Sequence, residues 1–188
     1  MTRTCGSCQK CCDLIPVKEI DKPANQRCIH QSHARGCKVY RGAGFPVACR
    51  YWTCRWLSDP QARALSRPDR SGYVVDVMPD FITVRDDDTG EVTKVQVVQI
   101  WCDPKRPNAH RDPQLRAYLH RRALENIAAL VRYSSHDAFV LFAPPMCSDG
   151  QWHEVHTNLN AVEHSVEEIV EALGPAYEAV DLSKTVGP

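Results

Sequence analysis

Cysteine is the residue type in this chain whose number and spacing could do chemistry. Ten cysteines occur in 188 residues, and eight of them lie within the first 54. Only disulfides or metal ions give so many closely spaced sulfurs a common purpose. The eight N-terminal cysteines are Cys5, Cys8, Cys11, Cys12, Cys28, Cys37, Cys49 and Cys54.

The spacing of the first cysteines favours metal ions over disulfides. Cys5/Cys8 and Cys8/Cys11 are both C-x2-C pairs, which let two sulfurs of one tight loop reach the same ion. Residues 1–10 are polar and contain no apolar run that could act as a signal peptide, so we expect a cytoplasmic protein. The cytosol keeps thiols reduced, and clustered cysteines there more often bind metal. Disulfides and plain buried cysteines are the weaker alternatives.

The adjacent pair Cys11-Cys12 limits how the sulfurs can share ions. Neighbouring Cα atoms lie ~3.8 Å apart, and their side chains diverge. If both bind metal, they more easily serve two ions held close together. Eight sulfurs then suit two four-coordinate sites, either separate or sharing a thiolate. In the one-ion alternative, Cys5, Cys8 and two later cysteines are the ligands, and His30 could replace one sulfur.

These residues resemble the YkgJ-type CxxCxxCC family, whose members are described as zinc- or iron-chelating proteins with eight cysteines. The resemblance covers about the first third of the chain. It implies metal chelation by the eight cysteines and no particular activity. The matching residues are Cys5-x2-Cys8-x2-Cys11-Cys12, Cys28, Gly36-Cys37, Tyr40, Pro46-x2-Cys49-Arg50 and Cys54.

The ligand type alone does not select the metal, because thiolates suit zinc and iron–sulfur clusters about equally. The C-x2-C-x2-C run resembles the start of a bacterial ferredoxin motif. That motif continues with a fourth cysteine three residues on, followed by proline, whereas here Cys12 follows Cys11 directly. We therefore expect zinc. Flagellin lysine methylases, which are distantly similar in this region, keep the alternative open: a redox protein or methyltransferase-like accessory enzyme with an iron–sulfur cluster at the same cysteines.

Basic and aromatic residues mix in the first segment, a combination that can bind nucleic acid. Residues 1–70 contain 13 Lys and Arg against 5 Asp and Glu, and residues 71–188 contain 10 against 18. Eight thiolates with two divalent ions would together carry about −4, so the arginines can offset this sulfur charge and the aromatic rings can exclude water. We favour this explanation over nucleic-acid binding and expect an unidentified protein or small-molecule partner. The residues concerned are Arg41, Arg50, Arg55, Tyr40, Tyr51, Trp52 and Trp56.

The elements that must position the cysteines suggest an α+β protein in three parts. Residues 1–57 form the cysteine-rich metal-chelating segment, which we expect to fold only around its ions or against the following domain. Residues 58–72 form a short helix and junction. Residues 73–188 form an α+β domain, a small antiparallel sheet packed by two helices. No run approaches the ~20 apolar residues of a membrane span.

The sequence also predicts individual elements of the last two parts. Ser58-Asp59-Pro60 begins a brief helix to about Leu65. Asp112-Pro113 begins a longer one to about Arg132, because apolar residues recur there every four positions. The remaining expected elements are strands at Tyr73–Met78, Phe81–Arg85, Val92–Trp101, Ala138–Phe142 and Trp152–Thr157, and an acidic helix at Ser165–Leu173.

Outside residues 1–57 the chemical signals are faint. Cys102 or Cys147 could act as a nucleophile, with His136, His153 or His156 as the base. Isolated cysteines are among the most buried residue types, so the inert interpretation is favoured. No catalytic residue is assigned, and the sequence leaves open whether the protein is an enzyme.

Overall fold

The computed structural model of the chain describes residues 3–32, 36–85, 88–156 and 165–179. In the first part of the chain, the regular elements are short. They are α1 (Lys10–Leu14), the 3-10 helix η1 (Lys18–Ile20), β1 (Gln31–Ser32), β2 (Gly36–Cys37), α2 (Val47–Tyr51), α3 (Arg55–Ser58), η2 (Pro60–Ala64) and α4 (Pro68–Ser71).

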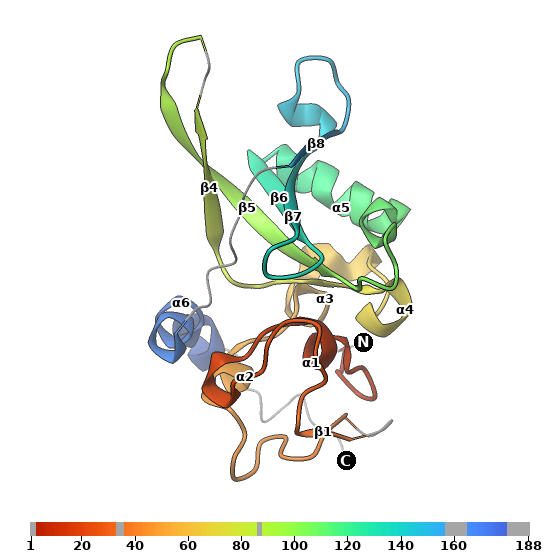
Figure 1. Cartoon of the computed structure of the whole chain (residues 1–188), viewed down its shortest axis with the longest axis vertical. Coiled ribbons are helices and arrows are strands. Elements are labelled where there is room, and N and C mark those ends of the chain that lie inside the picture. Colours follow the sequence, from red (N-terminus) through yellow and green to blue (C-terminus); the bar gives the residue numbers. More distant parts are fainter. Residues whose placement is uncertain (1–2, 33–35, 86–87, 157–164, 180–188) are drawn as a thin grey trace.

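The second part of the chain contains the longer elements of a mixed α/β fold. They are β3 (Tyr73–Val75), β4 (Asp80–Arg85), β5 (Val92–Cys102), η3 (Ala109–Arg111), α5 (Pro113–Ala123), β6 (Ile127–Arg132), β7 (Ala138–Phe142), η4 (Pro144–Met146), β8 (His153–His156) and α6 (Val166–Ala179). In Figure 1 the larger sheet and α5 form one end of the molecule, and α1, α2, β1 and α6 gather at the other.

Six strands form the larger sheet, in the order β3-β5-β6-β7-β8 with β4 also paired to β5. The 11-residue strand β5 is long enough to pair with β4 along its first half and with β3 along its last residues. β5 and β6 are parallel, and the other pairs are antiparallel. The sheet is therefore larger than the small antiparallel sheet that the sequence predicted, and it is mixed, because α5 returns the chain to the same end of β5.

The predicted helix from Asp112 to Arg132 is wrong in its second half. Helix α5 ends at Ala123, and Asn126 then adopts φ +59°, a left-handed conformation that a right-handed helix cannot include. The following residues form β6, whose six residues are all buried. A central strand with both faces covered is mostly apolar. Apolar residues of β6 therefore fall on the four-residue spacing of α5 without being part of the helix.

The other predicted elements differ mainly at their ends. The strand predicted at Ala138–Phe142 is confirmed as β7, and β8 covers most of the predicted Trp152–Thr157, whose last residue lies outside the described part of the chain. The brief helix after Ser58 is the 3-10 helix η2. The acidic helix continues to Ala179, beyond its expected end at Leu173.

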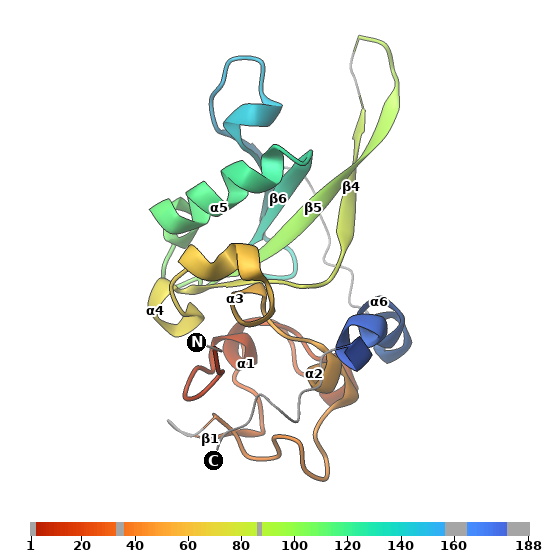
Figure 2. The ribbon, with the colours of Figure 1, turned by 180° about the vertical axis from the view of Figure 1, so that it is seen from behind.

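Helix α5 covers one face of the larger sheet (Figure 2). Leu115, Tyr118 and Leu119 of α5 are at most 2% exposed and belong to the main core with residues of β3, β5, β6 and β7. The alternate residues of the strands, among them Val97 and Leu130, form a second apolar cluster on the opposite face. Ala62 and Leu65 of the first part of the chain also belong to the main core, so this part packs against the larger sheet.

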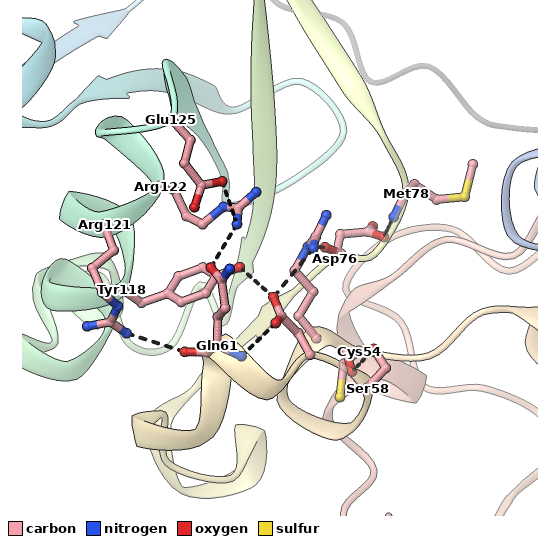
Figure 3. Close-up of polar contacts among 11 residues, drawn as sticks. Cys54, Ser58, Gln61, Asp76, Met78, Tyr118, Arg121, Arg122 and Glu125 are labelled. Atoms are coloured by element: carbon pink, nitrogen blue, oxygen red, sulfur yellow. Dashed lines mark hydrogen bonds and ion pairs between the residues drawn. The ribbon is translucent and has the colours of Figure 1, made fainter. Parts of the chain in front are cut away.

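The junction between the two parts is fixed by polar contacts to α5 (Figure 3). The Asp59 carboxylate accepts hydrogen bonds from the Gln61 backbone N–H at 2.7 Å, which caps η2, and from the Tyr118 hydroxyl at 3.2 Å. The Arg122 guanidinium donates to the Gln61 side chain at 2.9 Å. These bonds hold the segment that follows Cys54 against the helix.

The cysteine-rich segment is docked on β3 and the end of β5. Trp52 Nε1 donates to one oxygen of Asp76 at 2.7 Å, and Trp101 Nε1 donates to the other at 3.2 Å. Lys10 Nζ lies 2.9 Å from an Asp103 carboxylate oxygen. In the part of the chain that the structure describes, no helix has both the length and the apolar character needed to cross a membrane.

Candidate metal centre

The eight N-terminal cysteines divide into two groups of four. The first sulfur group lines a single pocket and consists of Cys5, Cys8, Cys11 and Cys54. We assign Cys12, Cys28, Cys37 and Cys49 to a second sulfur group, because the charges of Cys12 and Cys28 raise the pKa values of both Cys37 and Cys49; Cys12 also raises the pKa values of Cys5 and Cys11 and so lies between the groups. The boundary falls between the adjacent residues of the Cys11-Cys12 pair, as two ions held close together would require.

Three elements position the first sulfur group. A turn closed by a hydrogen bond from the Cys8 N–H to the Cys5 carbonyl at 3.0 Å presents the first two sulfurs. Cys11 follows in α1, and Cys54 is the residue directly before α3. The free space in the pocket is about 20 Å³, close to the room that one water-sized particle needs. Apolar side chains complete the wall, namely Trp56, Leu57, Pro68 and Val74.

The second sulfur group comes from four separate segments. Cys12 lies in α1, and its carbonyl accepts a hydrogen bond from the Cys28 N–H at 3.2 Å. Cys37 lies in β2, where it pairs with Gln31 of β1. Cys49 lies in the short helix α2. These segments are far apart in sequence, so other contacts must bring them together.

Two polar residues hold those segments in place. The buried amide of Gln31 donates to Gln9 Oε1 at 2.8 Å and to Asp13 Oδ1 at 2.9 Å, which fixes β1 against α1. The carboxylate of Glu19 accepts hydrogen bonds from the first backbone N–H groups of α2, those of Val47 at 3.0 Å and Ala48 at 3.1 Å. A carboxylate at this position satisfies donors that the helix itself cannot pair.

Burial keeps most of these thiols protonated when no metal is bound. Burial is the main cause that raises the pKa of Cys5 to about 11 and that of Cys49 and Cys54 to about 12, and neighbouring sulfur charges raise them further. Cys12 differs, because the hydrogen bond from Cys11 lowers its pKa to about 7. In the adjacent pair, the same hydrogen bond is the main cause that raises the pKa of Cys11, so the two sulfurs lie near each other.

Lys22 supplies a buried positive charge near both sulfur groups. The residue is 6% exposed, and its Nζ donates to the carbonyls of Ile15 and Pro23. Burial lowers the Lys22 pKa, whereas charges on Cys28, Cys12 and Cys11 raise it. Such a cation offsets thiolate charge, a role that the sequence suggested for arginines.

The arginines that the sequence singled out are placed differently. Arg55 donates through Nε to the Asp76 carbonyl at 2.8 Å and lies 3.5 Å from Asp59, so it belongs to the junction. Arg41 and Arg50 are exposed. Arg67, which the sequence did not single out, lies close enough to the first sulfur group to lower the pKa of Cys5.

The sulfurs of each group lie near one another, but further apart than the sulfurs around a single bound ion. All ten cysteines have free thiols. No three of the eight N-terminal sulfurs, all of which the structure describes, lie within 4.8 Å of one another. Tetrahedral zinc with Zn–S bonds of about 2.3 Å would bring the four sulfurs of a site to about 3.8 Å from each other. A single ion would therefore draw the sulfurs of each group inward.

His30 and the isolated cysteines take up other positions. His30, the substitute ligand, is half-buried directly before β1. Cys102 is 1% exposed at the end of β5, and burial raises its pKa to about 12, so it is an inert core residue. Cys147 lies in the loop between β7 and β8, near His153.

The structure adds Asp149, which sequence reasoning did not single out. The ligand atoms of Cys147, Asp149 and His153 lie within 4.8 Å of one another. Cys147 and His153 were considered only as a nucleophile and its base. The spacing C-x-D-x3-H within one loop is the signal that could have pointed to this cluster.

Comparison of the chain with models of protein families, with curated proteins and with solved structures gave no match. The resemblance to the CxxCxxCC family therefore rests only on the sequence motif, that is, the cysteines and the few residues that match beside them.

Proposed function

We propose that this protein binds metal through its eight N-terminal cysteines, with one zinc ion in each sulfur group. The observation that supports this most directly is the division of the eight sulfurs into two sets of four at the Cys11-Cys12 pair. Four thiolates make up a complete tetrahedral zinc site.

The proposed role of the ions is structural or in the interaction with a partner. A site closed by four thiolates has no open position for water, which favours structure over hydrolysis. The helices of residues 3–57 have at most five residues each, and such short helices are unstable in isolation. Metal binding would therefore supply folding energy to this segment.

An iron–sulfur protein is the second candidate, and the separation of the sulfurs favours it. In a [4Fe–4S] cluster, each of the four thiolates binds a different iron, so the sulfurs stand further apart than around one zinc ion. No three of the eight sulfurs are within 4.8 Å of each other, which suits this wider arrangement. The protein would then be a redox protein or an enzyme, such as a methyltransferase-like accessory protein.

Elemental analysis of protein purified without oxygen and without added metal tests both candidates. The zinc proposal predicts a colourless protein with two zinc ions per chain. A brown protein that contains iron and a matching amount of sulfide would contradict the zinc proposal and support the iron–sulfur candidate. Protein with neither metal would contradict both.

Substitutions then test the assignment of the ligands. Cys8→Ser should remove the ion of the first sulfur group, and Cys28→Ser that of the second. Cys102→Ser is the matched control, because this cysteine is buried outside both groups and its loss should leave the metal content unchanged. Unchanged metal content in Cys8→Ser would exclude Cys8 as a ligand.

A further inference from the structure

A second set of metal-ligand residue types lies far from the cysteine-rich segment. It belongs to the loop that connects β7 to β8 and to the first residue of β8. Figures 1 and 2 both show this loop at the end of the molecule opposite α1 and α2. Nothing in the proposed N-terminal centre involves it.

Three side chains of different chemistry converge in this loop. The Cys147 sulfur, an Asp149 carboxylate oxygen and a His153 ring nitrogen all lie within 4.8 Å of one another. His153 Nε2 is 3.0 Å and 2.9 Å from the two oxygens of Asp149. Cys147 is half-buried, and the side chains of His153 and Asp149 are 50% and 51% exposed. The cluster is therefore assembled and open to solvent.

The local backbone holds the three residues in this arrangement. Cys147 is the C-cap of η4, and its N–H donates to the Pro144 carbonyl at 3.1 Å. The Gly150 N–H then donates to the Cys147 carbonyl at 3.0 Å, and Gly150 takes φ +65°, which suits glycine. This turn brings Asp149 back over the start of β8, where His153 pairs with Phe142 of β7.

We propose that Cys147, Asp149 and His153 form a separate, solvent-open site for a zinc ion. Thiolate, imidazole and carboxylate are the three ligand types that zinc takes in proteins. Calcium and magnesium require oxygen ligands and do not suit a site with sulfur and nitrogen. Three protein ligands leave the fourth position for water or another ligand, unlike the four-thiolate N-terminal groups.

A nucleophilic cysteine is the competing interpretation of the same residues. Reactive thiols have a lowered pKa in an electropositive, partly exposed environment. At Cys147, burial and the charge of Asp149 both raise the pKa. Asp149 also holds the His153 ring through Nε2. The cluster suits a bound cation better than an activated thiolate, and the thiol proton would leave to solvent when the ion binds.

The test is the rate at which Cys147 of the full-length protein is alkylated with and without Zn²⁺, measured on the Cys147 peptide by mass spectrometry. Zn²⁺ should slow alkylation of wild-type Cys147 severalfold and in a saturable manner. Asp149→Asn and His153→Gln should abolish this protection. Both side chains are exposed, so circular dichroism should show an unchanged fold.

His136→Gln is the matched control, because His136 is an exposed histidine in another loop, and it should keep the protection. A wild-type alkylation rate that Zn²⁺ leaves unchanged would overturn the site, as would protection that persists in both Asp149→Asn and His153→Gln. The readout is confined to one peptide, so it does not depend on whether the N-terminal cysteines bind metal.

Discussion

The adjacent cysteines Cys11 and Cys12 decide how the N-terminal sulfurs are shared. Both lie in α1. Cys11 lines the pocket with Cys5, Cys8 and Cys54, whereas the charges of Cys12, Cys28 and Cys37 raise the pKa of Cys49. The spacing predicts that the pair serves two ions, because one ion cannot easily accept both sulfurs of neighbouring residues. Which later cysteine joins which group was not predictable, since it depends on where α2 and α3 pack.

The raised pKa values predict proton release on metal binding. Cys5 and Cys54 have pKa values of about 11 and 12, so these two thiols stay protonated at pH 9, and the pKa values of Cys8 and Cys11 are also raised. Zinc must displace these protons, and its affinity should therefore rise with pH. Thiols with an ordinary pKa of about 8.5 would already be mostly ionised at pH 9.

A titration of the metal-free Cys49→Ser variant with Zn²⁺ at pH 9, followed with a pH indicator, checks this prediction. The variant keeps all four sulfurs of the first group and lacks one of the second, and at least two protons, those of Cys5 and Cys54, should be released per ion. Release of about one proton or fewer would mean that the thiols are not held in a buried environment.

Trp52 should stabilise the docked segment more than a similar tryptophan nearby. Its Nε1 donates to the buried carboxylate of Asp76 at 2.7 Å, whereas Trp56 Nε1 donates to the neutral Leu65 carbonyl at 3.0 Å. Hydrogen bonds to charged groups contribute about 1.5–3 kcal/mol, against about 1 kcal/mol for neutral ones. Urea unfolding should give a larger loss of unfolding free energy for Trp52→Phe than for Trp56→Phe. Equal losses would contradict this account of the docking.

Among the elements, the turn after α5 shows what sequence periodicity could not reveal. Apolar residues recur every four positions from Leu115 to Val131, yet only the first part is helix. The signal that was available is Asn126, a residue type that tolerates the left-handed conformation found there. The strands β4, β5, β7 and β8 were predictable from alternation and β-branched residues, whereas the parallel pairing of β5 with β6 follows from this missed turn.

Asn126→Val should destabilise the protein by about 1–2 kcal/mol, because a β-branched residue is strained at positive φ. Asn126→Gly is the matched variant and should be close to neutral, since glycine adopts φ +59° without strain. The free energy of unfolding in urea measures both. If the two variants were equally stable, the left-handed turn would not be what ends α5.

Helix α6 should protect the second sulfur group. Ile169 and Leu173 of α6 are buried against Ala48 of α2, next to Cys49. Leu173→Ala should cost about 2–5 kcal/mol through the cavity that it leaves. It should also speed the transfer of metal from the second group to a chelator. Glu171→Ala, an exposed change on the same helix, should change neither the unfolding free energy nor the rate of metal transfer. Equal rates of metal transfer in the two variants would exclude this protective role.

At the scale of the whole molecule, a segment of short helices and two-residue strands packs against one end of the larger sheet. The sheet and α5 have their own buried core. The cysteine-rich segment adds few apolar residues and relies on Trp52, Lys10 and the proposed ions. The sequence predicted that this segment folds around metal or against the next domain, and the structure shows contacts of the second kind.

The mass of the intact protein under native conditions tests the central proposal most directly. For full-length chain purified without oxygen, we predict a mass that exceeds that of the polypeptide by two zinc ions, less the protons they displace. Cys8→Ser should reduce the excess to one ion. A mass equal to that of the metal-free chain, or lower by the hydrogens lost in disulfide formation, would contradict the proposal that the N-terminal sulfurs bind metal.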